Sequence, residues 1–155
     1  MKMKNKILFV CHGNICRSPM AEFVLKHKVS QLGISDEFEI ASAATSTEEI
    51  GNPVYPPVRE LLNKHHISCK GKVARQISKH DYQYYDHIIV MDNNNLRNLN
   101  RILGSDTSQK ISLLMDYTET HRDVADPWYT RDFEKTWDDV QRGCDGLLEF
   151  LGYSL

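Results

Sequence analysis

Short apolar runs alternate along the chain with longer segments in which apolar residues recur every three or four positions. The runs predict buried strands, and the longer segments predict helices that pack on a core. We expect strands near residues 7–11, 38–42, 86–91 and 110–114. We expect helices near residues 18–32, 54–65, 93–103 and 132–151, with Gly33 and Gly104 at two of their ends. This alternation predicts an α/β fold with a parallel sheet covered by helices on both faces.

The length and the regularity of this pattern predict a single domain. A chain of 155 residues is large enough to bury a core of its own. No internal repeat, low-complexity tract or linker interrupts the pattern. We therefore expect one domain over residues 1–155.

The most informative segment is the run 11–19, Cys-His-Gly-Asn-Ile-Cys-Arg-Ser-Pro, which directly follows the apolar stretch 7–10. The apolar stretch predicts a buried strand that delivers Cys11 to a short loop, and the Ser-Pro pair predicts the start of a helix. Gly13 and Asn14 are residue types that accept the positive φ angles of a tight turn, so successive backbone N–H groups can converge on one anion. The run therefore predicts a phosphate-binding loop.

Two features of this loop point to a nucleophile. The helix N-terminus adds positive potential, and Arg17 offers a planar fork for two phosphate oxygens. The same field favours the thiolate form of Cys11, which is the reactive form of cysteine. A thiolate that faces a bound phosphate predicts a phosphoryl-transfer site. The alternative is that Cys11 only ends a core strand and Arg17 only begins a helix.

The loop also gives the chain a resemblance to a known family. The Cys-x5-Arg-Ser spacing near the N-terminus, with Asp126-Pro127 far downstream, resembles the signature of the low-molecular-weight protein tyrosine phosphatases. The resemblance extends over nearly the whole chain, because further short stretches along it are also similar: Ser42-Ala43-Ala44-Thr45-Ser46, Gly51-Asn52-Pro53, Val73-Ala74-Arg75-Gln76, Met91-Asp92 and Trp128-Tyr129. The resemblance implies a three-layer, flavodoxin-like (phosphatase I-like) domain with a four-stranded parallel sheet. It also implies a protein tyrosine phosphatase that uses no cofactor.

Asp126 is the candidate general acid. A phenol has a pKa near ~10, and a positioned proton donor accelerates departure of its phenolate by roughly 10²–10⁴-fold. Asp126 lies in the segment 115–131, at the sheet edge where Cys11 is expected, and Pro127 restricts its backbone to extended conformations. An Asp-Pro pair also fits an ordinary turn, and it is the resemblance that implies the acid role. The weaker alternatives for the acid are Asp123, Asp116 and Asp92.

The resemblance and the residue chemistry together imply a two-step mechanism. Cys11 attacks phosphorus, Arg17 and the loop amides hold the equatorial oxygens, and Asp126 protonates the departing phenolate. Asp126 then takes a proton from the water that hydrolyses the phosphocysteine. Ser18 stabilises the leaving thiolate, and a helix-capping role is compatible with this. Because Arg17 and the amides neutralise the phosphate, no metal is expected.

The pocket walls are expected to set the substrate preference. Trp128 and Tyr129 follow the acid, so at least one of them is expected to stack on an aryl group, with core packing as the alternative. The family usually places an aromatic residue near position 48, where this chain has Glu48. This departure is expected to open one wall or to disfavour acidic phosphopeptides. His12 is expected to border the pocket mouth, and a general-base role for it is disfavoured.

The remaining loop residues have supporting roles. Asn14 is expected to bond across the loop, unless it is an ordinary turn residue. Cys16 can trap an oxidised Cys11 as a disulfide, with a buried packing role as the alternative. The predicted substrate-binding set is His12, Gly13, Asn14, Ile15, Cys16, Ser18, Glu48, Trp128 and Tyr129.

Three other functions compete with this interpretation. A protein-arginine phosphatase uses the same loop and fold, but that relative typically has threonine where this chain has Ile15. An arsenate reductase requires further redox cysteines in the middle of the chain, and none lies between Cys69 and Cys144. The third alternative is a non-catalytic module that binds phosphotyrosine. The presence of the nucleophile, the arginine and the acid together argues against it.

Composition and charge restrict the classes of molecule that the chain is expected to bind. A net charge of -2 with 41% hydrophobic and 26% charged residues argues against nucleic acid or a membrane as a partner. We expect a tyrosine-phosphorylated protein as substrate, phosphate or other oxyanions as inhibitors, and a monomer or weak homodimer. No apolar stretch approaches the ~20 residues of a membrane span or forms a signal-peptide core, so a cytoplasmic location is expected. The cysteines expected to stay reduced there are Cys11, Cys16, Cys69 and Cys144.

Overall fold

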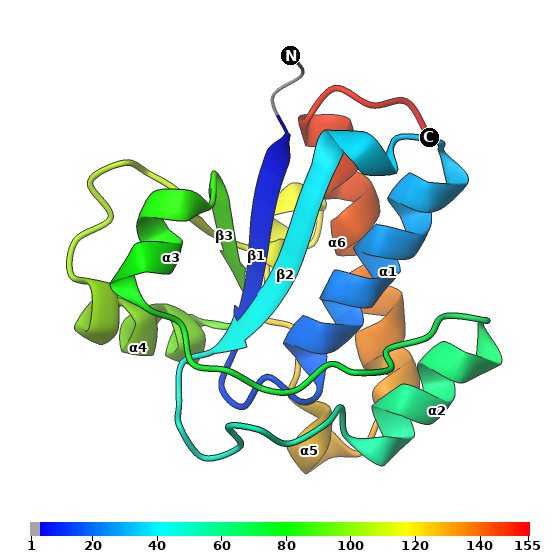
Figure 1. Cartoon of the computed structure of the whole chain (residues 1–155), viewed down its shortest axis with the longest axis horizontal. Coiled ribbons are helices and arrows are strands. Elements are labelled where there is room, and N and C mark those ends of the chain that lie inside the picture. Colours follow the sequence, from blue (N-terminus) through cyan, green and yellow to red (C-terminus); the bar gives the residue numbers. More distant parts are fainter. Residues whose placement is uncertain (1–3) are drawn as a thin grey trace.

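The four apolar runs form one parallel sheet, as predicted, and its strand order is β2-β1-β3-β4 (Figure 1). The computed structural model describes residues 4–155. The strands are β1 (Asn5–Cys11), β2 (Phe38–Ala44), β3 (His87–Val90) and β4 (Ile111–Leu113). β1 pairs in parallel with both β2 and β3. The strand that ends at Cys11 is therefore an interior strand of the sheet.

Helices cover both faces of this sheet, and four of them are those predicted from the sequence. These are α1 (Arg17–Gln31), α2 (Pro56–Lys64), α4 (Asn93–Leu103) and α6 (Phe133–Phe150). Gly33 and Gly104 have positive φ angles next to the ends of α1 and α4, as expected of residues that end helices. None of the helices described over residues 4–155 is both long enough and apolar enough to cross a membrane.

Four short elements were not predicted. They are α3 (Lys79–Tyr84), α5 (Pro127–Thr130) and the 3₁₀ turns η1 (Ser35–Glu37) and η2 (Leu114–Tyr117). Elements of three to six residues are too short to show a helical repeat of apolar positions. For α3 a different signal was present, because Ser78 and Asp81 form a reciprocal capping box at its start.

The alternation of side chains along β1 divides the core into two layers. Ile7 and Phe9 face a cluster formed with α1 and α6, whereas Leu8 and Val10 face a second cluster with α4. All four side chains are completely buried. In Figure 1, α1 and α6 lie on one side of the sheet and α3 and α4 on the other. Such a strand holds its last residue, Cys11, in a fixed position.

The loops that follow the strands are tied together at the C-terminal edge of the sheet. The backbone N–H groups of Thr45 and Ser46 donate to the carbonyls of Cys11 and His12, which joins the loop after β2 to the loop after β1. The N–H of Val124 donates to the carbonyl of Met91, which joins the segment before α5 to the end of β3. Ligands of open parallel sheets bind beyond this edge.

Candidate active site

The loop between β1 and α1 turns around the sulfur of Cys11. Asn14 adopts the left-handed conformation with φ 59°, and its N–H donates to Cys11 Sγ at 3.3 Å. Gly13 was the other residue of the loop able to take a positive φ, and it does not do so. One left-handed residue is enough for this turn, and a Cβ added to Gly13 would only make ordinary contact with Glu49 at 3.4 Å. The left-handed turn places the amide of Asn14 against the buried thiol.

The first turn of α1 supplies a second contact to the same sulfur. The helix begins at Arg17 with Cys16 as its N-cap residue, and no side chain caps it. The suggestion that Ser18 caps the helix is therefore wrong, because Ser18 lies inside the first turn. Its hydroxyl instead lies 3.0 Å from Cys11 Sγ. A hydroxyl at this distance can donate a hydrogen bond to a thiolate.

Asn14 holds the loop through three side-chain hydrogen bonds. Its Nδ2 donates to Ser18 Oγ at 2.8 Å and to Ser42 Oγ on β2 at 2.9 Å. Its Oδ1 accepts from the backbone N–H of Arg75 at 3.2 Å. Asn14 is only 1% exposed, so these bonds lie out of water and beneath the loop. The side chain thus joins the loop to β2 and to the segment before α3.

A buried carboxylate on α1 continues this chain of polar groups. Ser42 Oγ donates to Glu22 Oε1 at 2.5 Å, and Lys26 Nζ donates to Glu22 Oε2 at 2.6 Å. Lys72 Nζ lies 3.6 Å from Glu22. Burial lowers the pKa of Lys72, and the charge of Glu22 only partly offsets that effect. Sequence reasoning missed Glu22 and Lys72, because no local spacing shows which distant residue a buried carboxylate will meet.

Arg17 connects the loop to two other segments at the sheet edge. Its Nη1 donates to Asp92 Oδ2 at 2.7 Å and to the carbonyl of Val124 at 2.8 Å, and its Nη2 lies 3.4 Å from Asp126 Oδ2. Burial opposes the charge of Arg17, but Cys11, Asp92 and Asp126 together raise its pKa above the usual arginine value. The guanidinium is therefore charged and held in one orientation.

Asp126 is the acidic residue that reaches the pocket from the segment before α6. Its backbone is extended, with φ -79° and ψ 113°, as the following Pro127 predicted. Its Oδ1 accepts from the N–H of Trp128 at 3.0 Å, so the carboxylate caps α5. Of the weaker alternatives, Asp92 caps α4, Asp116 accepts from the N–H of Leu113 and Asp123 from that of Asn93. None of these three lines the pocket described next.

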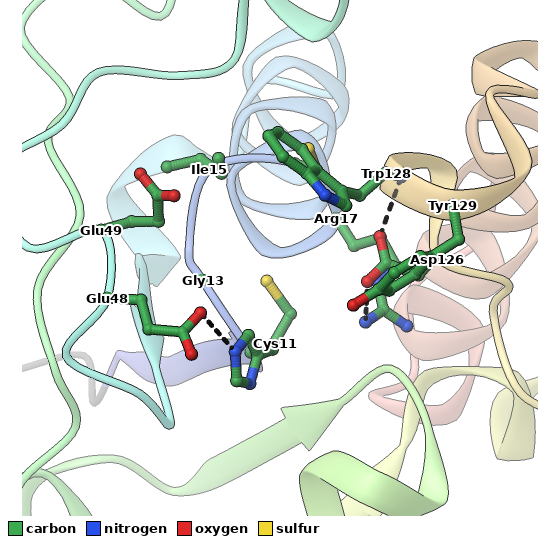
Figure 2. Close-up of a pocket in the computed structure, with 11 residues that line it drawn as sticks. Cys11, Gly13, Ile15, Arg17, Glu48, Glu49, Asp126, Trp128 and Tyr129 are labelled. Carbon is green, nitrogen blue, oxygen red and sulfur yellow. Dashed lines mark hydrogen bonds and ion pairs between the residues drawn. The ribbon is translucent and has the colours of Figure 1, made fainter.

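These groups surround one pocket of about 400 Å³. Glu48 and Glu49 lie on one side of Cys11, and Asp126, Trp128 and Tyr129 lie on the other (Figure 2). The residues that line the pocket are Cys11, His12, Gly13, Ile15, Cys16, Arg17, Glu48, Glu49, Asp126, Trp128 and Tyr129.

Most of the predicted substrate-binding residues line this pocket. The exceptions are Asn14 and Ser18, which lie beneath the loop. At the mouth, His12 Nε2 lies 2.9 Å from Glu48 Oε2, and both side chains are exposed. Glu49 was missed, although its position next to Glu48 was a signal for it. The pocket thus has an acidic wall and an aromatic wall.

Cys16 lies in the same loop as Cys11, but its environment is different. Its side chain is 5% exposed. Burial and the charges of Cys11 and Asp126 raise the pKa of Cys16 far above that of a free thiol, although Arg17 opposes them. Cys16 is therefore a neutral thiol that lines the same pocket as the buried Cys11.

Within residues 4–155, no group of three or more His, Cys, Asp or Glu side chains is arranged to hold a metal ion.

Comparisons with known proteins place the chain in a family. Residues 6–154 match the family model of the low molecular weight phosphotyrosine protein phosphatases. Over 144 residues the chain is 39% identical to the low molecular weight protein-tyrosine-phosphatase YfkJ of Bacillus subtilis, covering 92% of each chain. Over 148 residues it is 42% identical to the mouse low molecular weight phosphotyrosine protein phosphatase, covering 92% of this chain and 93% of the mouse protein.

Solved structures show the same relationship. The crystal structure of Bacillus subtilis YfkJ superposes with a TM-score of 0.92 at 37% identity, over 97% of this chain and 96% of that one. The Drosophila arginine phosphatase DARP superposes with a TM-score of 0.86 at 30% identity, over 97% and 99%. The chain belongs to the low molecular weight phosphotyrosine protein phosphatase family.

Proposed function

We propose that this chain hydrolyses phosphotyrosine in proteins, and small aryl phosphates, through a phosphocysteine intermediate on Cys11. The observation that carries the proposal is the convergence of Cys11, Arg17 and Asp126 on one pocket. Membership of the tyrosine phosphatase family supports the reaction. That the matched region spans residues 6–154 also supports a single catalytic domain over the whole chain.

The first step transfers the phosphoryl group to sulfur. The sulfur of Cys11 forms a bond to phosphorus while the bond between phosphorus and the phenolic oxygen breaks. Arg17 and the loop amides stabilise the charge on the equatorial oxygens. Asp126, on the opposite side of the pocket from Glu48, gives its proton to the departing phenolate.

The second step returns the enzyme to its starting state. Water attacks the phosphorus of the phosphocysteine and passes a proton to Asp126, while the bond between sulfur and phosphorus breaks. The electron pair stays on Cys11, where the hydroxyl of Ser18, 3.0 Å away, donates to the thiolate. Asn14 holds that hydroxyl by donating to Ser18 Oγ. The hydroxyl proton can then go to the sulfur, which at 3.0 Å is nearer than the other acceptor, the carbonyl of Ala43 at 3.5 Å. No metal takes part in these steps, because Arg17 and the amides supply the positive charge.

The depth of the nucleophile supports aryl over alkyl phosphates. Cys11 is 3% exposed, so the phosphate of a substrate has to descend to the floor of the pocket. A phosphotyrosine side chain is long enough to do so, and its ring then lies beside Trp128 and Tyr129. A phosphoserine side chain is shorter and brings the peptide backbone against the pocket rim. The proposed partners are therefore tyrosine-phosphorylated proteins, with phosphate and other oxyanions as inhibitors.

Protein-arginine dephosphorylation is the second candidate, because an arginine phosphatase has the same fold at 30% identity. The side chain of Ile15 lines the pocket and has no polar group for a guanidinium. An apolar side chain at this position supports phosphotyrosine over phosphoarginine as the substrate.

The four cysteines are free thiols, which supports action in a reducing compartment such as the cytoplasm.

The test is a comparison of initial rates on matched phosphotyrosine, phosphoserine and phosphoarginine peptides in the presence of a metal chelator. Cys11→Ser is the blank, and inorganic phosphate is added as a competitor. We expect selective phosphotyrosine turnover that the substitution abolishes and phosphate inhibits. Faster phosphoarginine turnover would favour the second candidate. Binding of the phosphotyrosine peptide without turnover would favour a non-catalytic module.

A further inference from the structure

Arg131 ends α5 in a conformation that non-glycine residues rarely adopt. Its φ is 60°, and a glycine would occupy this position without steric strain. The contacts of its guanidinium offset the energetic cost of this backbone conformation. Nη1 donates to the hydroxyl of Tyr55 at 3.0 Å, and the guanidinium carbon lies 5.5 Å from the centre of the Tyr55 ring and 5.2 Å from that of Phe133. Both distances fit cation–π contacts.

Tyr55 touches both the phosphate-binding loop and the segment that carries the acid. Its backbone N–H donates to the carbonyl of Ile15 at 2.9 Å. Its ring lies 4.9 Å from the ring of Trp128, measured between centroids, and 6.1 Å from that of Phe133. Tyr55 and Phe133 also pack against the main core cluster. One residue that is anchored in the core therefore contacts the segments on both sides of the nucleophile.

The acid depends on such support, because α5 has little stability of its own. It is a helix of four residues, which is shorter than a stable isolated helix. Three of its four residues are exposed, among them Trp128 at 45% and Tyr129 at 81%. Asp126 caps its first turn, and its other contact, to Arg17, is a long one of 3.4 Å. The chain before Asp126 is tied to the end of β3 and to Arg17 through Val124, so contacts at the far end of α5 supply the support that the short helix lacks on its other side.

We propose that Tyr55 and Arg131 are positioning residues for the general acid, and we refer to this pair as the Tyr55–Arg131 clamp. The inference rests on the proposed function. The clamp fixes the C-terminal end of α5, and with it the ring of Trp128, against a tyrosine bonded to the phosphate-binding loop. It thereby keeps the carboxyl group of Asp126 at the depth where the phenolic oxygen leaves phosphorus, as Cys11 bonds to it.

This role predicts an effect that depends on the leaving group. A phenolate of high basicity needs the proton from Asp126, whereas a strongly acidic phenol leaves without it. Loosening the clamp is therefore expected to slow the hydrolysis of substrates with a basic leaving group. Hydrolysis of substrates with a strongly acidic leaving group is expected to change little. A residue that only stabilises the fold would affect both kinds of substrate equally.

The test measures kcat/KM for a series of aryl phosphates from phenyl phosphate to 2,4-dinitrophenyl phosphate. We choose kcat/KM because it reports on the steps up to and including departure of the leaving group. It does so even if hydrolysis of the phosphocysteine limits kcat. Arg131→Gly is the main variant, because glycine relieves the backbone strain and should preserve the folded state. We expect about a tenfold loss on phenyl phosphate, part of the 10²–10⁴-fold general-acid effect. We expect no more than about a twofold change on 2,4-dinitrophenyl phosphate, and a thermal midpoint no lower than that of the wild type.

Three further variants test each part of the clamp. Tyr55→Phe keeps the ring on Trp128 and removes only the hydroxyl, so it is expected to shift the same leaving-group dependence to a smaller extent. Arg131→Lys keeps the charge without the planar contacts, and it is expected to behave like the glycine variant. Asp126→Asn sets the upper limit of the effect.

Three results would overturn the proposal. The first is an equal loss on all substrates in Arg131→Gly, and the second is an unchanged leaving-group dependence in both Arg131→Gly and Tyr55→Phe. The third is a leaving-group dependence in Arg131→Lys that equals that of the wild type. It would assign the effect to the charge of Arg131 alone and would reject the clamp. Absence of aryl phosphate hydrolysis in the wild type would instead reject the proposed function, so the two failures are distinguishable.

Discussion

Replacement of Asn14 by alanine is the sharpest single test of how the phosphate-binding loop is held. The substitution removes three buried hydrogen bonds, to Ser18 Oγ, to Ser42 Oγ and from the N–H of Arg75. It also forces an alanine into the left-handed conformation that Asn14 adopts at φ 59°. The variant therefore tests side-chain bonding and backbone strain in one loop.

The expected loss of stability follows from these contacts. Each buried hydrogen bond contributes about 0.5–1.5 kcal/mol, and the left-handed conformation costs alanine roughly 1–2 kcal/mol. The sum is about 2.5–6.5 kcal/mol, against a total stability of roughly 5–15 kcal/mol for a typical domain. Asn14→Ala is therefore expected to fold only marginally. Its kcat/KM should fall as well, because the amide at this position no longer faces Cys11 Sγ.

The assay is equilibrium urea unfolding, with kcat/KM for an aryl phosphate measured on the fraction that is folded. Asn63→Ala is the control, because Asn63 is an exposed residue of α2 and its substitution should change stability by less than about 0.5 kcal/mol. A loss below about 1.5 kcal/mol in Asn14→Ala, with normal activity, would refute the reasoning. It would mean that the loop keeps its shape without the bonds described for Asn14.

Three other predictions follow from separate features. Burial raises the pKa of Asp81, but hydrogen bonds from Arg75 and the backbone outweigh it and leave that pKa below the usual aspartate value. This stabilisation is complete above about pH 4 and is lost as the pH falls through the folded-state pKa, so Asp81→Asn should flatten the acid side of a curve of thermal midpoint against pH. Peroxide is expected to inactivate the enzyme reversibly, and Cys16→Ser to make the loss irreversible because Cys11 then lacks a partner thiol; full recovery of that variant with a reductant would contradict this. Glu48→Gln is expected to raise kcat/KM severalfold for phosphotyrosine peptides with acidic flanks and not for neutral ones; an equal change for both would exclude a charge effect.

The sequence predicted the parts of the site that depend on local patterns. The loop 11–18 was identified because a buried strand, a turn and a helix start follow one another within a few residues. The four strands were predicted from apolar runs, and the structure confirmed their parallel arrangement. The extended backbone at Asp126 followed from the restriction that Pro127 imposes.

The parts that sequence reasoning missed depend on contacts between distant segments. The Arg17 guanidinium is held by Asp92 and the carbonyl of Val124, which are 75 and 107 residues away along the chain. Nothing in local spacing indicates such partners. The left-handed position of Arg131 was also missed, because the sequence signals for that conformation are glycine and asparagine. Its compensating contact to Tyr55 is again long-range.

The contacts of Arg17 also bear on which anions the pocket admits. The one guanidinium of Arg17 faces two carboxylates, those of Asp92 and Asp126, which offset its positive charge. A chloride ion or a simple monoanion brings one charge and too few acceptor atoms to replace the carboxylate of Asp126. A phosphate dianion brings both the charge and three oxygens for the arginine and the loop amides. If Arg17 binds substrate as proposed, its pairing with two carboxylates is expected to make the pocket bind small monoanions weakly.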